Sequence, residues 1–269
     1  MFSISCHAQL QDGLERLKKA YPNQIKSYDD HDVVWSDHTR MLIGKDKSEK
    51  MLQEKLDSPS FYDQLTQSSY VAGKPINANS FHPVNDAGRI RYEPFFRKMY
   101  GNTVQAVMKK LVTIYWMPSV FGKRYPLLVT TINGVNIKLT HISKELEQLV
   151  QKHPEFLKYL RDPGGAFNWR TINHTNRLSA HSFGMSIDIN PAYSNYWQSD
   201  LERMGQPISE ASPLTYKSDI PWDIVVIFEN HGFIWGGKWY HYDTMHFEYR
   251  PEMFVSFRQI CVTSYRPKK

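Results

Sequence analysis

The sequence predicts an α+β protein in which a mainly helical N-terminal region, residues 1–120, precedes a mixed region, residues 121–269. Leucines recur at helical spacing within residues 8–21, and short β-rich runs alternate with helical patterns after Pro118. The chain has 269 residues, of which 41% are hydrophobic, so it can bury a sizeable core in one large domain or two modest ones.

The N-terminal region is expected to hold helices, a group of short strands and a polar connection. Asp-rich turns separate the β-type runs, which is typical of hairpins. We expect helices at residues 8–21, 48–56 and 94–116, the last interrupted by Gly101, with strands within residues 24–44 and the connection at residues 71–90.

The mixed region opens with the stretch YPLLVTTINGVNIKL, in which two β-rich runs meet at Asn133 and Gly134. Asn-Gly favours the two-residue turn of a β-hairpin, so a hairpin is predicted here. One helix is expected over residues 142–152 with Ser143 as its N-cap, and another over residues 221–232, which a proline opens and a glycine closes.

The charge balance bears on the class of partner. The chain has 33 Lys and Arg against 27 Asp and Glu, a net charge of +6, which suits anionic surroundings such as a bacterial cell wall or nucleic acid. The basic residues are dispersed, and the mixed stretch VMKKLVTIYW has the spacing of a buried helix face, so no nucleic-acid binding is predicted. No run approaches the roughly 18 apolar residues of a transmembrane helix, so no membrane span is expected.

The chain ends bear on the compartment of the protein. The first residues lack the basic and apolar segments of a signal peptide, so either the protein stays in the cytoplasm or a signal was removed before Met1. Cys6 and Cys261 lie too far apart in sequence for a C-x-x-C motif. One disulfide in an oxidising compartment and two free thiols are both compatible with this spacing.

The stretch RLSAHSFGMSIDIN places the charged Asp188 between Ile187 and Ile189. Seven residues of extended chain would separate His181 from Asp188 by about 23 Å, whereas each ligand of a zinc ion lies about 2.0 to 2.2 Å from it. The chain must therefore fold back between them, and Gly184 tolerates such a bend. Asp188 would then face a cation while the two isoleucines fill a core on the opposite face of a strand.

A second cluster, WYHYDTMHFEYRP, supplies a third candidate ligand, His246. Zinc hydrolases commonly use three protein ligands and keep a fourth position open. Asp243 would face away from His246 in a regular strand, so both serve one site only if Asp243 lies in a bend before the strand, and the glycines of WGGKW favour such a bend. Asp243 is then placed to act as general base toward a metal-activated water. His241 is the rival ligand, although it would face away from His246 in a regular strand.

The stretch SAHSFGMSIDIN resembles the S-x-H-x-x-G-x-x-x-D segment, and DTMHFE the D/E-x-x-H segment, of the zinc D-alanyl-D-alanine carboxypeptidases and L-alanyl-D-glutamate endopeptidases, the VanY-like peptidases of bacterial cell walls. The resemblance spans roughly residues 125–255. It implies that His181, Asp188 and His246 bind Zn²⁺ and that Asp243 is the catalytic base. It also implies a small antiparallel sheet with flanking helices, the D-Ala-D-Ala peptidase or hedgehog-like core.

The resemblance further implies an arginine upstream of the S-x-H segment that stabilises the transition state. FNWRTI places Arg170 where the endopeptidase-like members carry R-x-I, and Arg177 is the competing candidate. Such a guanidinium can neutralise the oxyanion that forms when water attacks a peptide carbonyl. The remaining candidates for substrate binding or for support of the ligands are Ser179, Glu248, His241 and Trp239.

The predicted function is that of a zinc metallopeptidase that hydrolyses an amide bond in peptidoglycan stem peptides, for wall remodelling or lysis. Aspartate rather than glutamate as base favours an L-Ala-D-Glu-type endopeptidase over a D-Ala-D-Ala carboxypeptidase, and the substrate implies the periplasm or the cell wall. A non-catalytic, zinc-stabilised module that binds wall peptide or a protein is the alternative. The presence of the base beside all three ligands favours the enzyme. Residues 1–120 exceed what the smallest family members carry, and they could shape the cleft, bind glycan or inhibit the enzyme.

Overall fold

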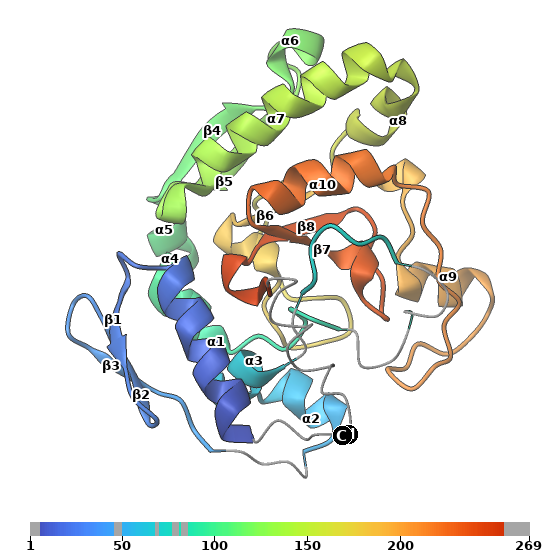
Figure 1. Cartoon of the computed structure of the whole chain (residues 1–269). Coiled ribbons are helices and arrows are strands. Elements are labelled where there is room, and N and C mark those ends of the chain that lie inside the picture. The colour runs from blue at the N-terminus through green and yellow to red at the C-terminus, as the bar shows by residue number, and fades with distance from the viewer. Residues whose placement is uncertain (1–5, 46–49, 68–69, 77–80, 82–85, 256–269) are drawn as a thin grey trace, which may run out of the picture. The chain divides into compact units, whose positions relative to one another are not determined.

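The computed structural model describes residues 6–45, 50–67, 70–76, 81 and 86–255, which form parts of two compact units (Figure 1). The first unit comprises Met1–Lys74, Ala87–Tyr92 and Arg250–Lys269, and the second comprises Pro75–Asp86 and Glu93–Tyr249. The functional boundary expected near residue 120 stays a prediction. The cysteine pair falls outside the description, because Cys261 and the side chain of Cys6 are not among the described parts.

The first unit combines helices with a three-stranded antiparallel sheet of order β1-β2-β3. Leu10, Leu14 and Leu17 are buried on one side of the first helix, as their spacing predicts. The strands fall within residues 24–44, also as predicted. The elements are α1 (Cys6–Ala20), β1 (Ile25–Tyr28), β2 (Asp32–Trp35), β3 (Arg40–Leu42), α2 (Leu52–Asp57), α3 (Phe61–Thr66) and the 3-10 turn η6 (Pro251–Met253).

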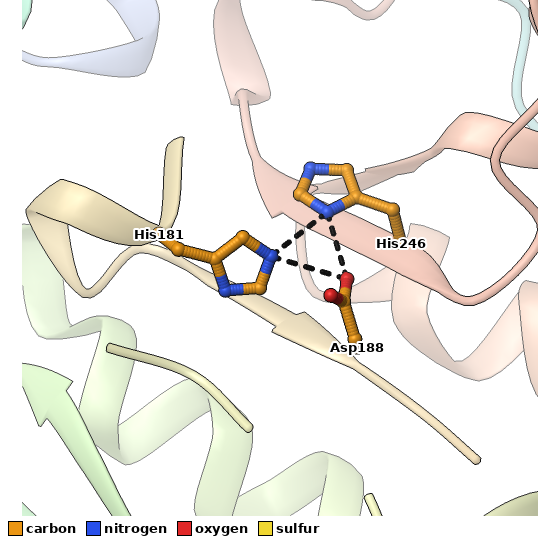
Figure 2. Close-up of side chains that lie close together, drawn as sticks. All are labelled: His181, Asp188 and His246. Atoms are coloured by element: carbon orange, nitrogen blue, oxygen red, sulfur yellow. Dashed lines mark hydrogen bonds and ion pairs between the residues drawn. The ribbon is translucent and has the colours of Figure 1, made fainter. Parts of the chain in front are cut away.

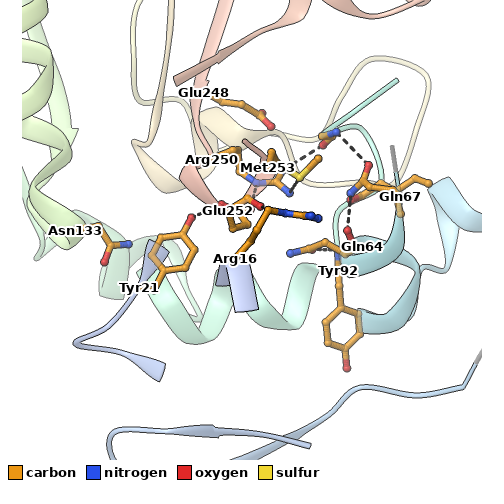
Figure 3. A network of polar contacts seen from close by, with 12 residues as sticks. Arg16, Tyr21, Gln64, Gln67, Tyr92, Asn133, Glu248, Arg250, Glu252 and Met253 are labelled. Atoms are coloured by element: carbon orange, nitrogen blue, oxygen red, sulfur yellow. Dashed lines mark hydrogen bonds and ion pairs between the residues drawn. The ribbon is translucent and has the colours of Figure 1, made fainter. Parts of the chain in front are cut away.

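A buried polar network ties the C-terminal part of the first unit to its first helix (Figure 3). The Arg250 guanidinium, which is fully buried, donates to Glu252 Oε1 at 2.5 Å and to the Gly88 carbonyl at 3.2 Å. Tyr21 donates its hydroxyl to Glu252 Oε2 at 2.6 Å, and Arg16 Nε donates to the Glu252 carbonyl at 3.0 Å. Burying a charged group is costly unless a partner of opposite charge is buried with it, and Glu252 supplies that partner.

Within the described residues, the second unit contains the other helices and two antiparallel sheets. Its helices are α4 (Glu93–Tyr100), α5 (Val104–Met108), α6 (Pro118–Phe121), α7 (Val135–Lys152), α8 (Leu157–Leu160), α9 (Trp197–Arg203) and α10 (Trp222–Asn230). Its strands are β4 (Leu111–Tyr115), β5 (Pro126–Thr130), β6 (Ser186–Asp188), β7 (Phe233–Trp235) and β8 (His246–Tyr249). The 3-10 turns are η1 (Ile132–Gly134), η2 (Pro154–Phe156), η3 (Ala180–Phe183), η4 (Pro191–Tyr193) and η5 (Gly236–Lys238).

The helix expected over residues 94–116 is wrong in its second half. The helical pattern is interrupted at Gly101 as predicted, but Leu111–Tyr115 forms strand β4, which pairs with β5. The three consecutive β-branched residues of LVTIY favour an extended chain, and the partner strand provides the hydrogen bonds that a helix would otherwise supply.

The hairpin predicted at Asn133 and Gly134 is also wrong. Both residues adopt the positive φ that the predicted turn requires, 56° and 67°. The chain continues instead into α7, because the apolar residues from Val135 onward recur at helical spacing and are buried on one face. Ser143 is therefore not an N-cap but lies inside α7, where its hydroxyl accepts a hydrogen bond from the Met117 N–H at 2.5 Å.

The sheet that positions the site has the order β6-β8-β7, with antiparallel pairs throughout. All four side chains of the central strand β8 are buried, and α10 packs against β7 and α7 beside it (Figure 1). Phe228 of α10 stacks on Phe247 of β8 with ring centroids 3.8 Å apart. The predicted α+β class, with a small antiparallel sheet and flanking helices, is confirmed. No helix in the described ranges is long and apolar enough to cross a membrane.

Candidate metal centre

His181 lies in the short turn η3 between the preceding loop and strand β6. The Ser179 hydroxyl caps this turn by accepting a hydrogen bond from the His181 N–H at 3.3 Å. Gly184 ends the turn with φ of +63°, a conformation that favours glycine. The chain thus folds back between His181 and Asp188 at the residue that the sequence predicts.

Asp188 and His246 are direct partners in the antiparallel pair of β6 and β8. Asp188 is the last residue of β6 and His246 the first of β8, so both side chains stand at one end of the sheet. Ile187 and Ile189 are fully buried on either side of Asp188, as predicted. The pairing register therefore brings two distant sequence motifs to one place.

Three potential ligand atoms converge between these elements (Figure 2). His181 Nε2 lies 3.1 Å from Asp188 Oδ1, His246 Nδ1 lies 2.9 Å from the same oxygen, and the two nitrogens are 3.2 Å apart. Ligands about 2.1 Å from a tetrahedral zinc ion are about 3.4 Å from one another, so the triangle is close to what one ion requires.

The outer nitrogens of both histidines meet hydrogen-bond acceptors. His181 Nδ1 lies 2.8 Å from the Ala166 carbonyl, and His246 Nε2 lies 3.1 Å from Glu248 Oε2. Each ring can donate to its acceptor, which leaves the two inner nitrogens with lone pairs directed at the shared Asp188 oxygen. Two lone pairs and a carboxylate oxygen at such distances repel one another unless a cation or a proton lies among them. The residues present therefore fit a divalent cation such as zinc.

In the protein without metal, the contacts among these three residues also shift their pKa values. Burial opposes a charged His246 ring, but hydrogen bonds to Asp188 and Glu248 outweigh it and raise the pKa of His246 to about 10. Burial also disfavours ionisation of Asp188, yet the charges of and hydrogen bonds to His181 and His246 hold its pKa below the usual range. The centre therefore favours positive charge between its three members.

Asp243 lies in the bend that precedes β8, and its N–H donates to the Gly236 carbonyl at 3.0 Å. Its Oδ1 atom is buried and has no hydrogen-bond partner among the residues that the structure describes. Burial and the negative charge of Asp188 raise the pKa of Asp243 to about 7, while the charges of the two site histidines and Arg170 oppose that rise.

The glycines of WGGKW make this bend available. A Cβ atom on Gly236 would lie 2.6 Å from the Asp243 carbonyl oxygen, and one on Gly237 would lie 2.2 Å from the Trp235 ring. Side chains at either position would displace the backbone that carries Asp243. The irregular approach that the sequence suggests is therefore present.

The structure separates the two candidate arginines. Arg170 lies close enough to Asp243 for its charge to affect the pKa of that carboxyl group. Ser182 fixes the Arg170 backbone, since its hydroxyl accepts from the Arg170 N–H and donates to the Arg170 carbonyl, both at 3.0 Å. The Arg177 guanidinium lies 3.8 Å from Glu210 Oε1. The part played by Ser182 carries no sequence signal beyond its proximity to His181.

The other candidate residues take different places. Ser179 caps η3, Glu248 contacts His246, and the Trp239 ring lies 5.7 Å from the His246 ring. His241 is not brought into the metal centre but forms a second buried group with Asp86 and Glu210. Sequence reasoning missed that group because its members are far apart in the chain and belong to no motif.

Comparison with known proteins agrees with this geometry. A family model described as D-alanyl-D-alanine carboxypeptidase matches residues 173–249, a range that contains the three converging residues and Asp243 and excludes Arg170. No curated protein and no solved structure matches the chain. The match supports the resemblance that the sequence predicts: residues 173–249 are similar to the D-alanyl-D-alanine carboxypeptidase family.

Proposed function

We propose that the protein is a zinc-dependent peptidase that hydrolyses an amide bond in the stem peptides of bacterial peptidoglycan. One observation carries the proposal: His181 Nε2, Asp188 Oδ1 and His246 Nδ1 lie within 3.2 Å of one another. A nearby carboxylate, Asp243, keeps one buried oxygen without a partner among the described residues. The family match supports a peptidase in general, and the ligand types support zinc.

Each side chain of the site has a separate role in the proposed reaction. A zinc ion held by His181, Asp188 and His246 would supply Lewis-acid chemistry at the substrate carbonyl and would make water acidic enough to react near neutral pH. Asp243 accepts the proton of the attacking water and later passes it to the leaving amine. A pKa near 7 suits a group that must both take up and release a proton at neutral pH. Arg170 neutralises negative charge on the carbonyl oxygen.

The bond and the compartment are part of the proposal. An aspartate in the place of the base favours an L-Ala-D-Glu-type endopeptidase, with the D-Ala-D-Ala carboxypeptidase as the second candidate of the same chemistry. Either substrate lies in the bacterial wall, so the periplasm or the cell surface is the proposed location. The net charge of +6 suits that anionic surrounding.

The test measures zinc content and muropeptide hydrolysis of the purified protein beside Asp243→Ala. We expect about one zinc per chain in both proteins, hydrolysis by the wild type, and a loss of kcat of at least ~100-fold in the variant. Asp219→Ala removes an exposed carboxylate of the second unit and is expected to keep full activity. The products identify the bond that is cut.

Two results would contradict the proposal in different ways. Wild-type protein without zinc, after incubation with the ion, would show that the ligand assignment is wrong. Zinc-loaded protein that binds muropeptides and cleaves none would make it a wall-binding module instead of an enzyme.

A further inference from the structure

A second buried group in the same unit joins three segments that are distant in sequence. His241 Nδ1 lies 2.6 Å from Asp86 Oδ2, and the His241 N–H donates to Asp86 Oδ1 at 3.1 Å. His241 Nε2 lies 3.2 Å from both the carbonyl oxygen and Oε2 of Glu210. The imidazole is 1% exposed, so water does not compete for these contacts.

The geometry of this group differs from that of the metal centre. Around His181, Asp188 and His246 the ligand atoms converge on one point, whereas His241 meets a carboxylate at each of its two ring nitrogens. One ligand atom each of Asp86, Glu210 and His241 lie within 4.8 Å of one another, but the two acidic residues meet His241 at different ring nitrogens. The arrangement is that of a bridge between two acidic side chains.

The hydrogen bonds define the charge of the bridge. A neutral imidazole has one N–H and one lone pair, so it would direct a lone pair at one of the two acceptors. Only the imidazolium form donates to both, and the distance of 2.6 Å to Asp86 is typical of a charge-assisted hydrogen bond.

The bridge connects the two sequence motifs of the metal centre. Glu210 also lies 3.8 Å from Arg177, which leads into the S-x-H segment, while His241 stands two residues before Asp243. Two aromatic rings pack against the His241 ring: the centroid of Trp197 lies 4.8 Å and that of Tyr240 lies 5.1 Å from the His241 centroid. The charged groups that face His241 include Asp86 and Glu210, with Arg177 behind Glu210.

The position of Asp243 depends on this backbone. No hydrogen bond among the described residues orients its buried Oδ1 atom. Its N–H is held by the Gly236 carbonyl at 3.0 Å, and the adjacent Tyr242 carbonyl accepts from the Trp197 N–H at 3.0 Å. The Tyr242 hydroxyl donates to Asp200 Oδ2 at 2.5 Å. The place of the carboxylate is therefore set by the segment around it, in which His241 contacts both Asp86 and Glu210.

We infer that His241, clamped as an imidazolium between Asp86 and Glu210, is a positioning residue that holds Asp243 in its catalytic place. This inference rests on the proposed function, since it assigns Asp243 the role of base. It adds a group, Asp86 and Glu210, that lies outside both motifs.

The test compares His241→Gln and Asp86→Asn with the control His231→Gln. His231, the C-cap residue of α10, pairs with Glu145 of α7 at 2.6 Å, and neither residue belongs to the candidate metal centre. We expect the two clamp variants to keep one zinc per chain and an unchanged KM while kcat falls ~10- to ~100-fold. The control His231→Gln is expected to match the wild type in zinc content, KM and kcat.

Two readouts do not depend on activity. ¹⁵N NMR of the wild-type imidazoles is expected to show both nitrogens of His241 protonated at pH 7. Hydrogen exchange of the amides in residues 239–245 is expected to be faster in His241→Gln than in His231→Gln. If wild-type protein hydrolyses no muropeptide, the proposed function fails, and these two measurements still decide whether the clamp exists.

The inference is overturned by any of three results. The first is a neutral His241 ring in the wild type. The second is wild-type kcat in folded Asp86→Asn and Glu210→Gln, which are the milder variants should His241→Gln not fold. The third is a loss of zinc in parallel with activity, because that would place the effect on the ligands instead of on Asp243.

Discussion

Asp243 is a carboxylate that the fold makes harder to ionise. Its burial and the neighbouring Asp188 raise its pKa to about 7, so in the metal-free protein at alkaline pH the folded state contains an unfavourable negative charge. A raised carboxyl pKa contributes stability that is fully present below the unfolded pKa of about 3.9 and is lost as the pH rises through 7.

Asp243→Asn is therefore expected to stabilise the metal-free protein at pH 8. The difference between the folded pKa of about 7 and the unfolded pKa of about 3.9 limits the gain in the free energy of unfolding to about 4 kcal/mol. The gain should shrink by about half at pH 5.5, where the folded wild type already carries the proton. Urea unfolding of EDTA-treated protein at both pH values measures it.

Asp219→Asn is the matched control, because its side chain is exposed and its substitution is expected to change little at either pH. Equal stabilities of wild type and Asp243→Asn at pH 8 would contradict the argument.

The positions of individual residues can be predicted from the sequence wherever one short motif constrains several of them. The spacing of His181, Gly184 and Asp188 allows few foldings that bring both polar residues to one ion, and the structure adopts the expected bend. Asp86 could not be predicted in the same way. Its contact with His241 crosses more than half the chain and depends on the tertiary fold alone.

Among the elements, the turn η3 depends on the absence of one side chain. Gly184 has φ of +63°, and a Cβ there would lie 2.7 Å from Leu111 Cδ2 and 3.2 Å from the Thr130 nitrogen. The turn that carries His181 therefore packs directly against the β4–β5 pair, and its position is sensitive to anything added at residue 184.

Gly184→Ala is expected to lower the free energy of unfolding by about 1 to 3 kcal/mol, because both the backbone conformation and the contact become unfavourable. It is also expected to weaken zinc binding, since His181 belongs to the same turn. Gly205→Ala is the control: its φ of +65° carries a similar conformational cost, but nothing lies within 4 Å of the added atom. A Gly184→Ala protein with the zinc affinity and stability of Gly205→Ala would refute the packing argument.

The two wrong predictions of secondary structure, the hairpin at Asn133 and the helix through Leu111, share one cause. Local patterns at Asn133 and Gly134 identify a turn with positive φ correctly, yet the pattern does not say whether a strand or a helix follows. The buried face of α7 decides for the helix. Likewise, the stretch from Leu111 satisfies both periodicities for a few residues, and pairing with β5 decides for the strand.

For the whole molecule, the buried pair of Arg250 and Glu252 is the critical point of the first unit. The two side chains are 0% and 4% exposed, and Glu252 also accepts the Tyr21 hydroxyl. Removing the carboxylate takes from the guanidinium an ionic partner that offsets the cost of its desolvation.

Glu252→Ala is expected to lower the free energy of unfolding of the first unit by about 3 to 5 kcal/mol, and Glu252→Gln, which keeps a hydrogen-bond acceptor, by less. Limited proteolysis and urea unfolding measure the effect. Glu155→Gln removes the carboxylate of an exposed pair with His153, and its expected change is below about 1 kcal/mol. Equal effects of the Glu252 and Glu155 variants would contradict the importance of the buried pair.

The α+β class and the residues of the candidate metal centre are predictable from composition, periodicity and two motifs, because each motif consists of residues close in sequence. The convergence of the two motifs depends on the register of β6 and β8. The composition of the first unit is not predictable in this way. It takes residues from three separate stretches, and no local pattern indicates that the chain after Tyr249 returns to the N-terminal helix.

This return has a consequence for biosynthesis. A ribosome releases the chain from its N-terminus, and domains usually fold in that order. Here the early helix α1 packs against Glu252 and Met253, which are synthesised after the whole second unit, because that unit is complete once Tyr249 has emerged. The unit made first is therefore finished last, and until then its apolar leucines depend on partners that have not yet left the exit tunnel.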